Sequence, residues 1–241
     1  GVGEHIRRYE GWAGLFSEAM IGMAGVDLPG HGISDGKKGH IRSYAITDEM
    51  IDILLRECRK TFPGVPLFLY GHSLGGGIVL DYLIRKNPDI RGAIVTSPWL
   101  RLSFEPDRMK VKLAGILKSI VPSLVQSSGL VVDHISRDAA VVEQYRKDPR
   151  VHELISVSLF HSAMSAASAA LKNASNLKKL LLLMHGTGDQ ICSHEGSLEF
   201  AEKTPLVELR LWEGAYHELH NDLCRHEVFD TIRSWIEDKL S

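Results

Sequence analysis

The stretch LFLYGHSLGGG, residues 67–77, places one serine between glycines directly after a short apolar run. Its centre, Gly71-His72-Ser73-Leu74-Gly75, fits the pattern G-x-S-x-G. Between a strand and a helix, this pattern forms a sharp turn that lifts a serine hydroxyl above the end of a sheet. We therefore predict a buried strand over 65–70, a helix over 76–87, and Ser73 as a nucleophile at the turn between them.

The glycines around Ser73 have separate expected roles. Side chains at positions 71 and 75 should collide with the neighbouring strand and helix, which explains a glycine at both. Gly76 and Gly77 should let the helix pack closely on the sheet. The first turn of that helix directs its dipole and free N–H groups at the serine, which suits a developing oxyanion.

The rest of the chain alternates apolar runs with amphipathic stretches. We predict further strands over 23–28, 92–97, 177–186 and 206–214, and helices over 44–60 and 226–240. This alternation predicts an α/β fold, with a mostly parallel sheet flanked by helices. No strand is expected from Ser103 to Ala170, so 103–170 is interpreted as an inserted helical cap between core segments 1–102 and 171–241.

A serine hydroxyl becomes a good nucleophile only beside a base that an acid orients. In this architecture the acid and then the histidine follow the serine along the chain, each just past a later strand. Asp189 follows the predicted strand 177–186, and His217 follows the strand 206–214. Ser73, Asp189 and His217 are therefore the predicted catalytic residues.

Other residues compete for these roles. His220 lies one helical turn after His217 and is an alternative base. Glu213 and Glu218 are acids close to that histidine, but we interpret them as loop or surface groups. Asp27 follows the predicted strand 23–28 and precedes LPGHG, where a structural role in the turn is the better interpretation.

Composition narrows the class of protein. The 241 residues are 44% apolar with a net charge of −2, which leaves no electrostatic footprint for nucleic acid. Three cysteines without a C-x-x-C pair argue against a disulfide framework and favour a reducing, cytoplasmic setting. H-E-x-x-H, a complete G-x-G-x-x-G and a P-loop are all missing from the sequence, so we expect neither a metal site nor an organic cofactor.

Several motifs together are more specific than the serine turn alone. They are GVGEHIRRYE (1–10), DLPGHGISDG (27–36), GHSLGGG (71–77), SPWL (97–100), HGTGDQICS (185–193) and EGAYHELHND (213–222). On these motifs the chain resembles α/β-hydrolases of the monoacylglycerol lipase and lysophospholipase group. In that group the opening motif reads His-Gly-x-Gly-Glu-His. Here the leading histidine and the family's first strands are missing, so we expect the chain to be a fragment that begins downstream of them.

The resemblance implies a serine-esterase mechanism, a helical cap and roles for the opening residues. The backbone N–H groups of Val2 and Leu74 would form the oxyanion hole, as the general rule for this fold also predicts. Glu4, Arg8 and His72 match positions that surround the polar head of the substrate. A Glu4–Arg8 pair that only pins the oxyanion loop is the alternative.

The expected substrate follows from the cap. Residues 109–125, MKVKLAGILKSIVPSLV, combine apolar residues with three lysines, as in a basic amphipathic helix at a membrane surface. Such a helix either packs on the core or lines an acyl-chain tunnel with a face toward lipid. We therefore expect a single-chain lipid ester, a monoacylglycerol or lysophospholipid, and peripheral membrane contact. The alternatives are another carboxylesterase, thioesterase or C–C bond hydrolase on this fold, and a non-catalytic ligand binder.

Overall fold

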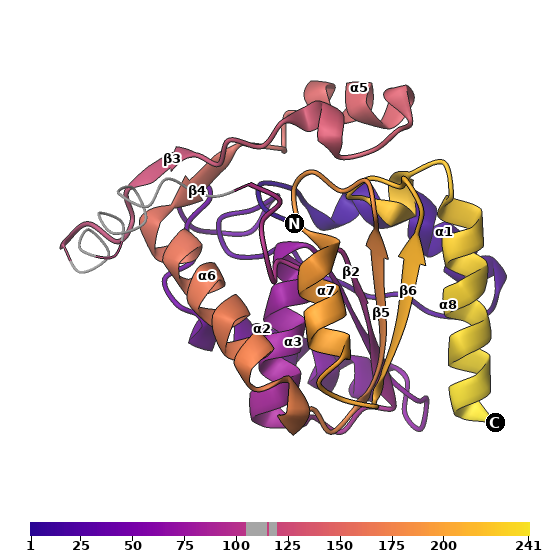
Figure 1. Ribbon diagram of the computed structural model, residues 1–241. Coiled ribbons are helices and arrows are strands. Elements are labelled where there is room, and N and C mark those ends of the chain that lie inside the picture. Colours follow the sequence, from indigo (N-terminus) through magenta and orange to yellow (C-terminus); the bar gives the residue numbers. More distant parts are fainter. Residues whose placement is uncertain (105–114, 116–119) are drawn as a thin grey trace.

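The computed structural model describes residues 1–104, 115 and 120–241. At its centre lies a four-stranded parallel sheet in the order β1-β2-β5-β6 (Figure 1). The strands are β1 (Phe68–His72), β2 (Gly92–Thr96), β5 (Leu180–Gly186) and β6 (Val207–Trp212). The predicted α/β fold with a parallel sheet is confirmed, and the bounds of these four strands differ from the prediction by at most three residues.

Helices cover both faces of the sheet. Leu181 and Leu183 pack with α2 (Tyr44–Thr61), α3 (Leu74–Lys86), α6 (Val157–Lys172) and α7 (His194–Ala201) on one side. Leu182 and Met184 pack with α1 (Glu10–Glu18) and α8 (Arg225–Leu240) on the other. Successive strand residues point to opposite faces, so an apolar run such as β5 needs a helical layer on each side.

The predicted strand over 23–28 is wrong. These residues are irregular and pair with no strand among those that the structure describes. An apolar run becomes a strand only when a neighbour completes its backbone hydrogen bonds. Asp27 nevertheless has the predicted role in the turn, because its carboxylate accepts the N–H groups of Ile6 at 2.7 Å and Ile33 at 2.9 Å.

The prediction that 103–170 contains no strand is also wrong. Two three-residue strands, β3 (Val125–Ser127) and β4 (Leu154–Ser156), pair antiparallel. Between them lie the 3₁₀ helix η2 (Val132–His134) and α5 (Ala139–Lys147), and α5 lies above the carboxyl ends of the sheet strands (Figure 1). Most of the amphipathic segment predicted over 109–125 falls outside the described residues.

The last helix within the predicted cap region, α6, packs on the core. Leu159, Ala163 and Ala167 of α6 are buried in the same apolar cluster as Leu80 and Leu83 of α3. Small residues on α6 allow the two helices to lie close together, which explains the alanine-rich sequence there. The division at 103–170 stays a prediction, and this packing favours a boundary near Ser156.

Candidate active site

Ser73 occupies a strained turn between β1 and α3. Its φ is 54° and its ψ is −119°, a conformation that costs a side-chain-bearing residue free energy. Three backbone hydrogen bonds of 3.0 Å hold the turn: Ser73 N–H donates to the Thr96 carbonyl, and the Ser73 carbonyl accepts from the N–H groups of Gly77 and Trp99. Strain maintained in this way is typical of a functional residue rather than of an ordinary loop.

The glycines of the turn differ in their surroundings. A Cβ on Gly71 would lie 2.7 Å from the Gly75 carbonyl oxygen, and a Cβ on Gly76 would lie 3.0 Å from Val95. The expected collision at Gly75 is wrong, because a Cβ there would meet nothing within 4 Å. Close packing therefore explains Gly71 and Gly76, while Gly75 borders open space.

The structure brings Ser73, His217 and Asp189 together. His217 Nε2 lies 2.9 Å from Ser73 Oγ, and His217 Nδ1 lies 2.7 Å from Asp189 Oδ2. All three residues are buried. Because only Nδ1 faces a carboxylate, we assign the ring hydrogen to Nδ1, which leaves Nε2 to accept the serine proton. This arrangement suits proton transfer from the hydroxyl.

Charge and burial act in opposite directions on the two titratable partners. Burial disfavours protonated His217, but the charge of Asp189 and the hydrogen bond that His217 donates to it outweigh burial and raise the pKa of His217. Burial likewise opposes ionisation of Asp189, yet His217 and the hydrogen bonds from His185 and His217 keep its pKa below the ordinary value. Asp189 is therefore ionised, and its charge favours the protonated form of His217.

The loop after β5 fixes the orientation of the Asp189 carboxylate. Oδ1 accepts the N–H groups of Ile191 at 2.8 Å and Cys192 at 3.0 Å. Oδ2 accepts from His217 and also lies 3.1 Å from Nε2 of His185. Sequence reasoning did not single out His185, although it stands four residues before the predicted acid.

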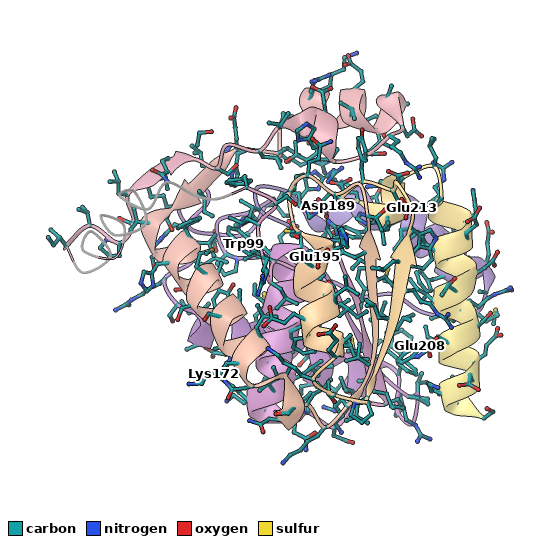
Figure 2. All side chains as sticks on the ribbon, in the orientation of Figure 1. Trp99, Lys172, Asp189, Glu195, Glu208 and Glu213 are labelled. Carbon is teal, nitrogen blue, oxygen red and sulfur yellow. The ribbon has the colours of Figure 1, made fainter. Side chains whose placement is uncertain are left out.

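Of the alternative residues, His220 makes no hydrogen bond to the serine. Its ring stacks on Tyr9 at 4.6 Å, and neither ring nitrogen has a hydrogen-bond partner among the described residues. Burial lowers the pKa of His220 to about 4. Glu213 is exposed beyond β6, at the carboxyl end of the sheet (Figure 2). Among the described residues, neither side chain makes a hydrogen bond to Ser73 or His217.

Glu218 lies in a loop, as expected, but it is not a surface group. Its carboxylate is 3% exposed and accepts two hydrogen bonds from Arg8, at 2.6 Å and 2.7 Å. Arg8 also donates to Glu4 at 2.5 Å, and its guanidinium lies 4.6 Å from the centre of the Tyr145 ring. These contacts connect the opening loop, the loop that carries His217, and α5 of the cap.

The remaining predicted residues lie beside Ser73. A Cβ built on Gly1 would be 3.5 Å from Ser73 Cβ, so the loop that contains Val2 borders the serine. Leu74 is the first residue of α3, where backbone N–H groups have no partner within the helix. The ring of His72 is 4.8 Å from that of His217, and burial and the two neighbouring histidines hold the pKa of His72 well below its ordinary value.

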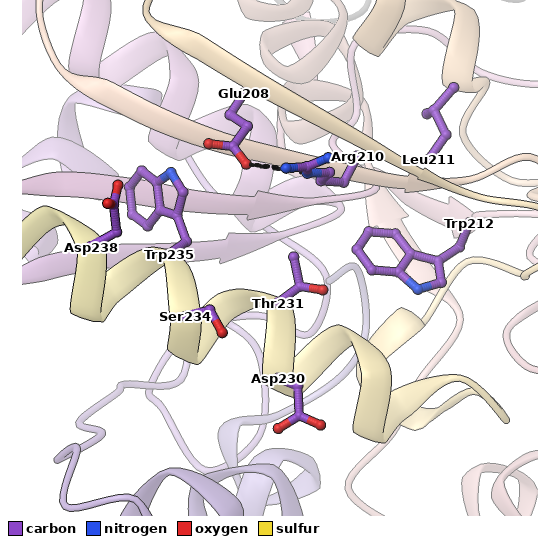
Figure 3. A pocket seen from close by; sticks show the side chains of 9 residues that line it. All are labelled: Glu208, Arg210, Leu211, Trp212, Asp230, Thr231, Ser234, Trp235 and Asp238. Atoms are coloured by element: carbon purple, nitrogen blue, oxygen red, sulfur yellow. Dashed lines mark hydrogen bonds and ion pairs between the residues drawn. The ribbon is translucent and has the colours of Figure 1, made fainter.

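Two surface hollows lie away from Ser73. One of about 540 Å³ lies between β6 and α8 and is lined by Trp212, Trp235 and acidic side chains (Figure 3). The other, of about 580 Å³, lies against α5 and includes Arg137 and Tyr216. Neither is lined by Ser73, Asp189 or His217. In the part of the chain that the structure describes, His, Cys, Asp and Glu side chains form no group of three suited to a metal ion.

Comparison with known proteins identifies the family of this chain. The family model "Serine aminopeptidase, S33" (Hydrolase_4) matches residues 1–224. Over its full length the chain is 34% identical to an abhydrolase domain-containing protein of Dictyostelium discoideum, of which it spans 26%. It is 29% identical to a monoacylglycerol lipase of Mycolicibacterium smegmatis, with all of this chain and 86% of that protein covered.

The fold has a close counterpart among solved structures. The crystal structure of Paleococcus ferrophilus monoacylglycerol lipase is 35% identical and superposes with a TM-score of 0.92, covering 99% of this chain and 92% of that one. The chain thus belongs to the serine aminopeptidase S33 (Hydrolase_4) family and is a carboxylic ester hydrolase with the α/β-hydrolase fold.

Proposed function

We propose that Ser73, His217 and Asp189 are the catalytic residues, acting through an acyl-enzyme. His217 Nε2 takes the proton as Ser73 Oγ attacks the ester carbonyl, and Asp189 stabilises the imidazolium. His217 then donates the proton to the departing alkoxide. A water that the same histidine deprotonates releases the acid. The observation that carries this proposal is the pair of hydrogen bonds that joins the strained serine to His217 and Asp189.

The oxyanion of the tetrahedral intermediate would be held by the N–H groups of Val2 and Leu74. The position of Leu74 at the start of α3 supports this role, because the helix dipole favours negative charge there. The nearness of the Gly1–Gly3 loop to Ser73 supports the role of Val2. One such donor is worth ~2.7–4 kcal/mol of the barrier.

The substrate class is proposed to be single-chain lipid esters, monoacylglycerols or lysophospholipids. Support comes from the monoacylglycerol lipases among the similar proteins. Glu4, Arg8 and His72 are proposed to border the polar head. Since Arg8 is already paired with Glu4 and Glu218, its larger role is to hold the loops in place, and Glu4 and His72 are the better candidates for direct contact.

Peripheral contact with a membrane is proposed for the cap. Ile120, Val121 and Leu124 are between 42% and 70% exposed, and such apolar side chains side by side suit a lipid surface. Within the described ranges no helix is long and apolar enough to cross a bilayer. A cytoplasmic location with peripheral membrane contact remains our proposal for the setting.

The proposal is tested by labelling with a fluorophosphonate probe and by a panel of monoacylglycerols, lysophospholipids and acyl thioesters. Wild type, S73A and a control variant at an exposed serine of α1, S17A, are compared. We expect labelling and glycerolipid hydrolysis in wild type and S17A and neither in S73A. Turnover confined to thioesters would support the thioesterase alternative. A folded wild type that neither labels nor hydrolyses any substrate would support the non-catalytic binder.

A further inference from the structure

The buried histidine at the end of β5 has contacts that the proposed mechanism does not explain. His185 is fully buried, and its side chain reaches two other elements. Nε2 lies 3.1 Å from Asp189 Oδ2 and 3.0 Å from the Cys192 carbonyl oxygen. Nδ1 lies 2.8 Å from the hydroxyl of Ser197 on α7, a residue that is also fully buried.

The chemistry of these contacts decides where the ring carries a hydrogen. Both neighbours of Nε2, a carboxylate and a carbonyl, are acceptors only. Nε2 must therefore carry a hydrogen and donate it, or two acceptors would face an unprotonated nitrogen in a buried site. The Ser197 hydroxyl holds the opposite side of the ring and so fixes its rotation.

The Asp189 carboxylate is thus bound at both oxygens by four donors. Two are backbone N–H groups on Oδ1, and two are ring N–H groups on Oδ2. If only the two backbone donors held the carboxylate, Oδ1 would stay in place but Oδ2 could still move. A second donor on Oδ2, in addition to His217, removes that freedom.

We propose that His185 is a positioning residue for hydrolysis: its Nε2–H holds Asp189 Oδ2 where His217 needs it. This inference rests on the proposed role of Asp189 as the catalytic acid. A hydrogen bond shared with His185 also draws charge from Oδ2 and so limits how strongly Asp189 favours protonated His217. The other titratable side chains nearby are Cys192, on the same loop, and His194, whose ring lies 6.5 Å away at the start of α7.

Two amide variants separate the positioning role from simple packing. The amide nitrogen of glutamine occupies the place of Nε2 and can still donate to Asp189, whereas asparagine reaches only as far as Nδ1 and leaves Asp189 Oδ2 with one donor fewer. H185Q and H185N are both polar and buried at the same position, so H185Q serves as the matched control. Circular dichroism and thermal unfolding of each variant verify that it is folded.

We expect H185N to lose roughly tenfold or more in kcat, within the ~100-fold that a misplacement of about 1 Å can cost, with KM unchanged. H185Q should recover most of that loss. The acid limb of the kcat/KM profile of H185N should lie about half a pH unit higher than in wild type, because Asp189 then acts more strongly on His217.

Two results would overturn the inference: H185N with wild-type kcat and pH profile, or equal losses in H185N and H185Q that follow their losses in stability. Wild type and S73A are labelled with the fluorophosphonate in the same experiment. If wild type does not label, the proposed function fails, whatever the His185 variants do. If labelling behaves as expected and H185N equals wild type, only the role of His185 fails.

Discussion

Replacing Arg8 by methionine removes the cation that two buried carboxylates share. Arg8, Glu4 and Glu218 are 8%, 5% and 3% exposed, and three hydrogen bonds of 2.5 to 2.7 Å join them. Methionine keeps most of the volume of the arginine side chain, so the loss of folding stability is chiefly electrostatic. Removing one partner of a buried ion pair typically costs ~3–5 kcal/mol, because the remaining charge stays buried and unpaired.

The loss in R8M should depend on pH, and the sign follows from Glu4. Burial by itself would raise the pKa of Glu4, but nearby positive charge, that of Arg8 included, holds it well below its ordinary value. In wild type this pairing contributes stability above pH 4.5 and is lost as pH falls. Without the charge of Arg8, the effect of burial on the pKa of Glu4 is less opposed and the pKa rises, so this buried carboxylate can take up a proton. The deficit of R8M should therefore shrink by on the order of 1 kcal/mol between pH 8 and pH 5.

Urea unfolding at both pH values measures this effect in wild type, R8M, R8K and the triple variant R8M/E4Q/E218Q. We expect R8K to be intermediate, since lysine keeps the charge but not the planar fork of donors. The triple variant should regain most of the stability, since it leaves no buried charge. A deficit of R8M that is equal at pH 8 and pH 5, together with a triple variant no more stable than R8M, would refute the reasoning.

Three further predictions concern the site itself. D189N should lower kcat by ~10⁴-fold with little change in fold, because the amide favours the wrong tautomer of His217; more than a tenth of wild-type kcat in steady-state assays would contradict the assignment. The acid limb of the kcat/KM profile should lie above about pH 6.5, since Asp189 raises the pKa of His217 and activity needs the unprotonated ring; a midpoint below 6 would be inconsistent with this. Burial and Asp189 raise the pKa of the Cys192 thiol, which lies beside Ser73, so an alkylating reagent at pH 7.5 should modify the half-buried Cys58 first and without loss of activity. Activity should fall only as Cys192 is modified, which mass spectrometry follows. Full activity after complete modification of Cys192 would show that this thiol does not matter for hydrolysis.

Much of the fold could be read from local patterns. The apolar runs that became β1, β2, β5 and β6 alternate with amphipathic helices, and these periodicities come from backbone geometry alone. The run at 23–28 has the same composition but is irregular, because a strand also needs a hydrogen-bonded neighbour. The three-residue strands of the cap are too short to leave a period-2 signal.

The serine turn could be predicted from local sequence, and so could the order of Asp189 and His217 after it and the strand before each. These features depend on neighbouring residues and on a connection rule. The packing of distant segments, in contrast, buries Glu218 against Arg8, 210 residues away, and lets His185 share Oδ2 of Asp189 with His217. Burial and partner choice depend on how distant elements pack, and a charged side chain in a loop has the same local sequence whether solvent or an ion pair surrounds it.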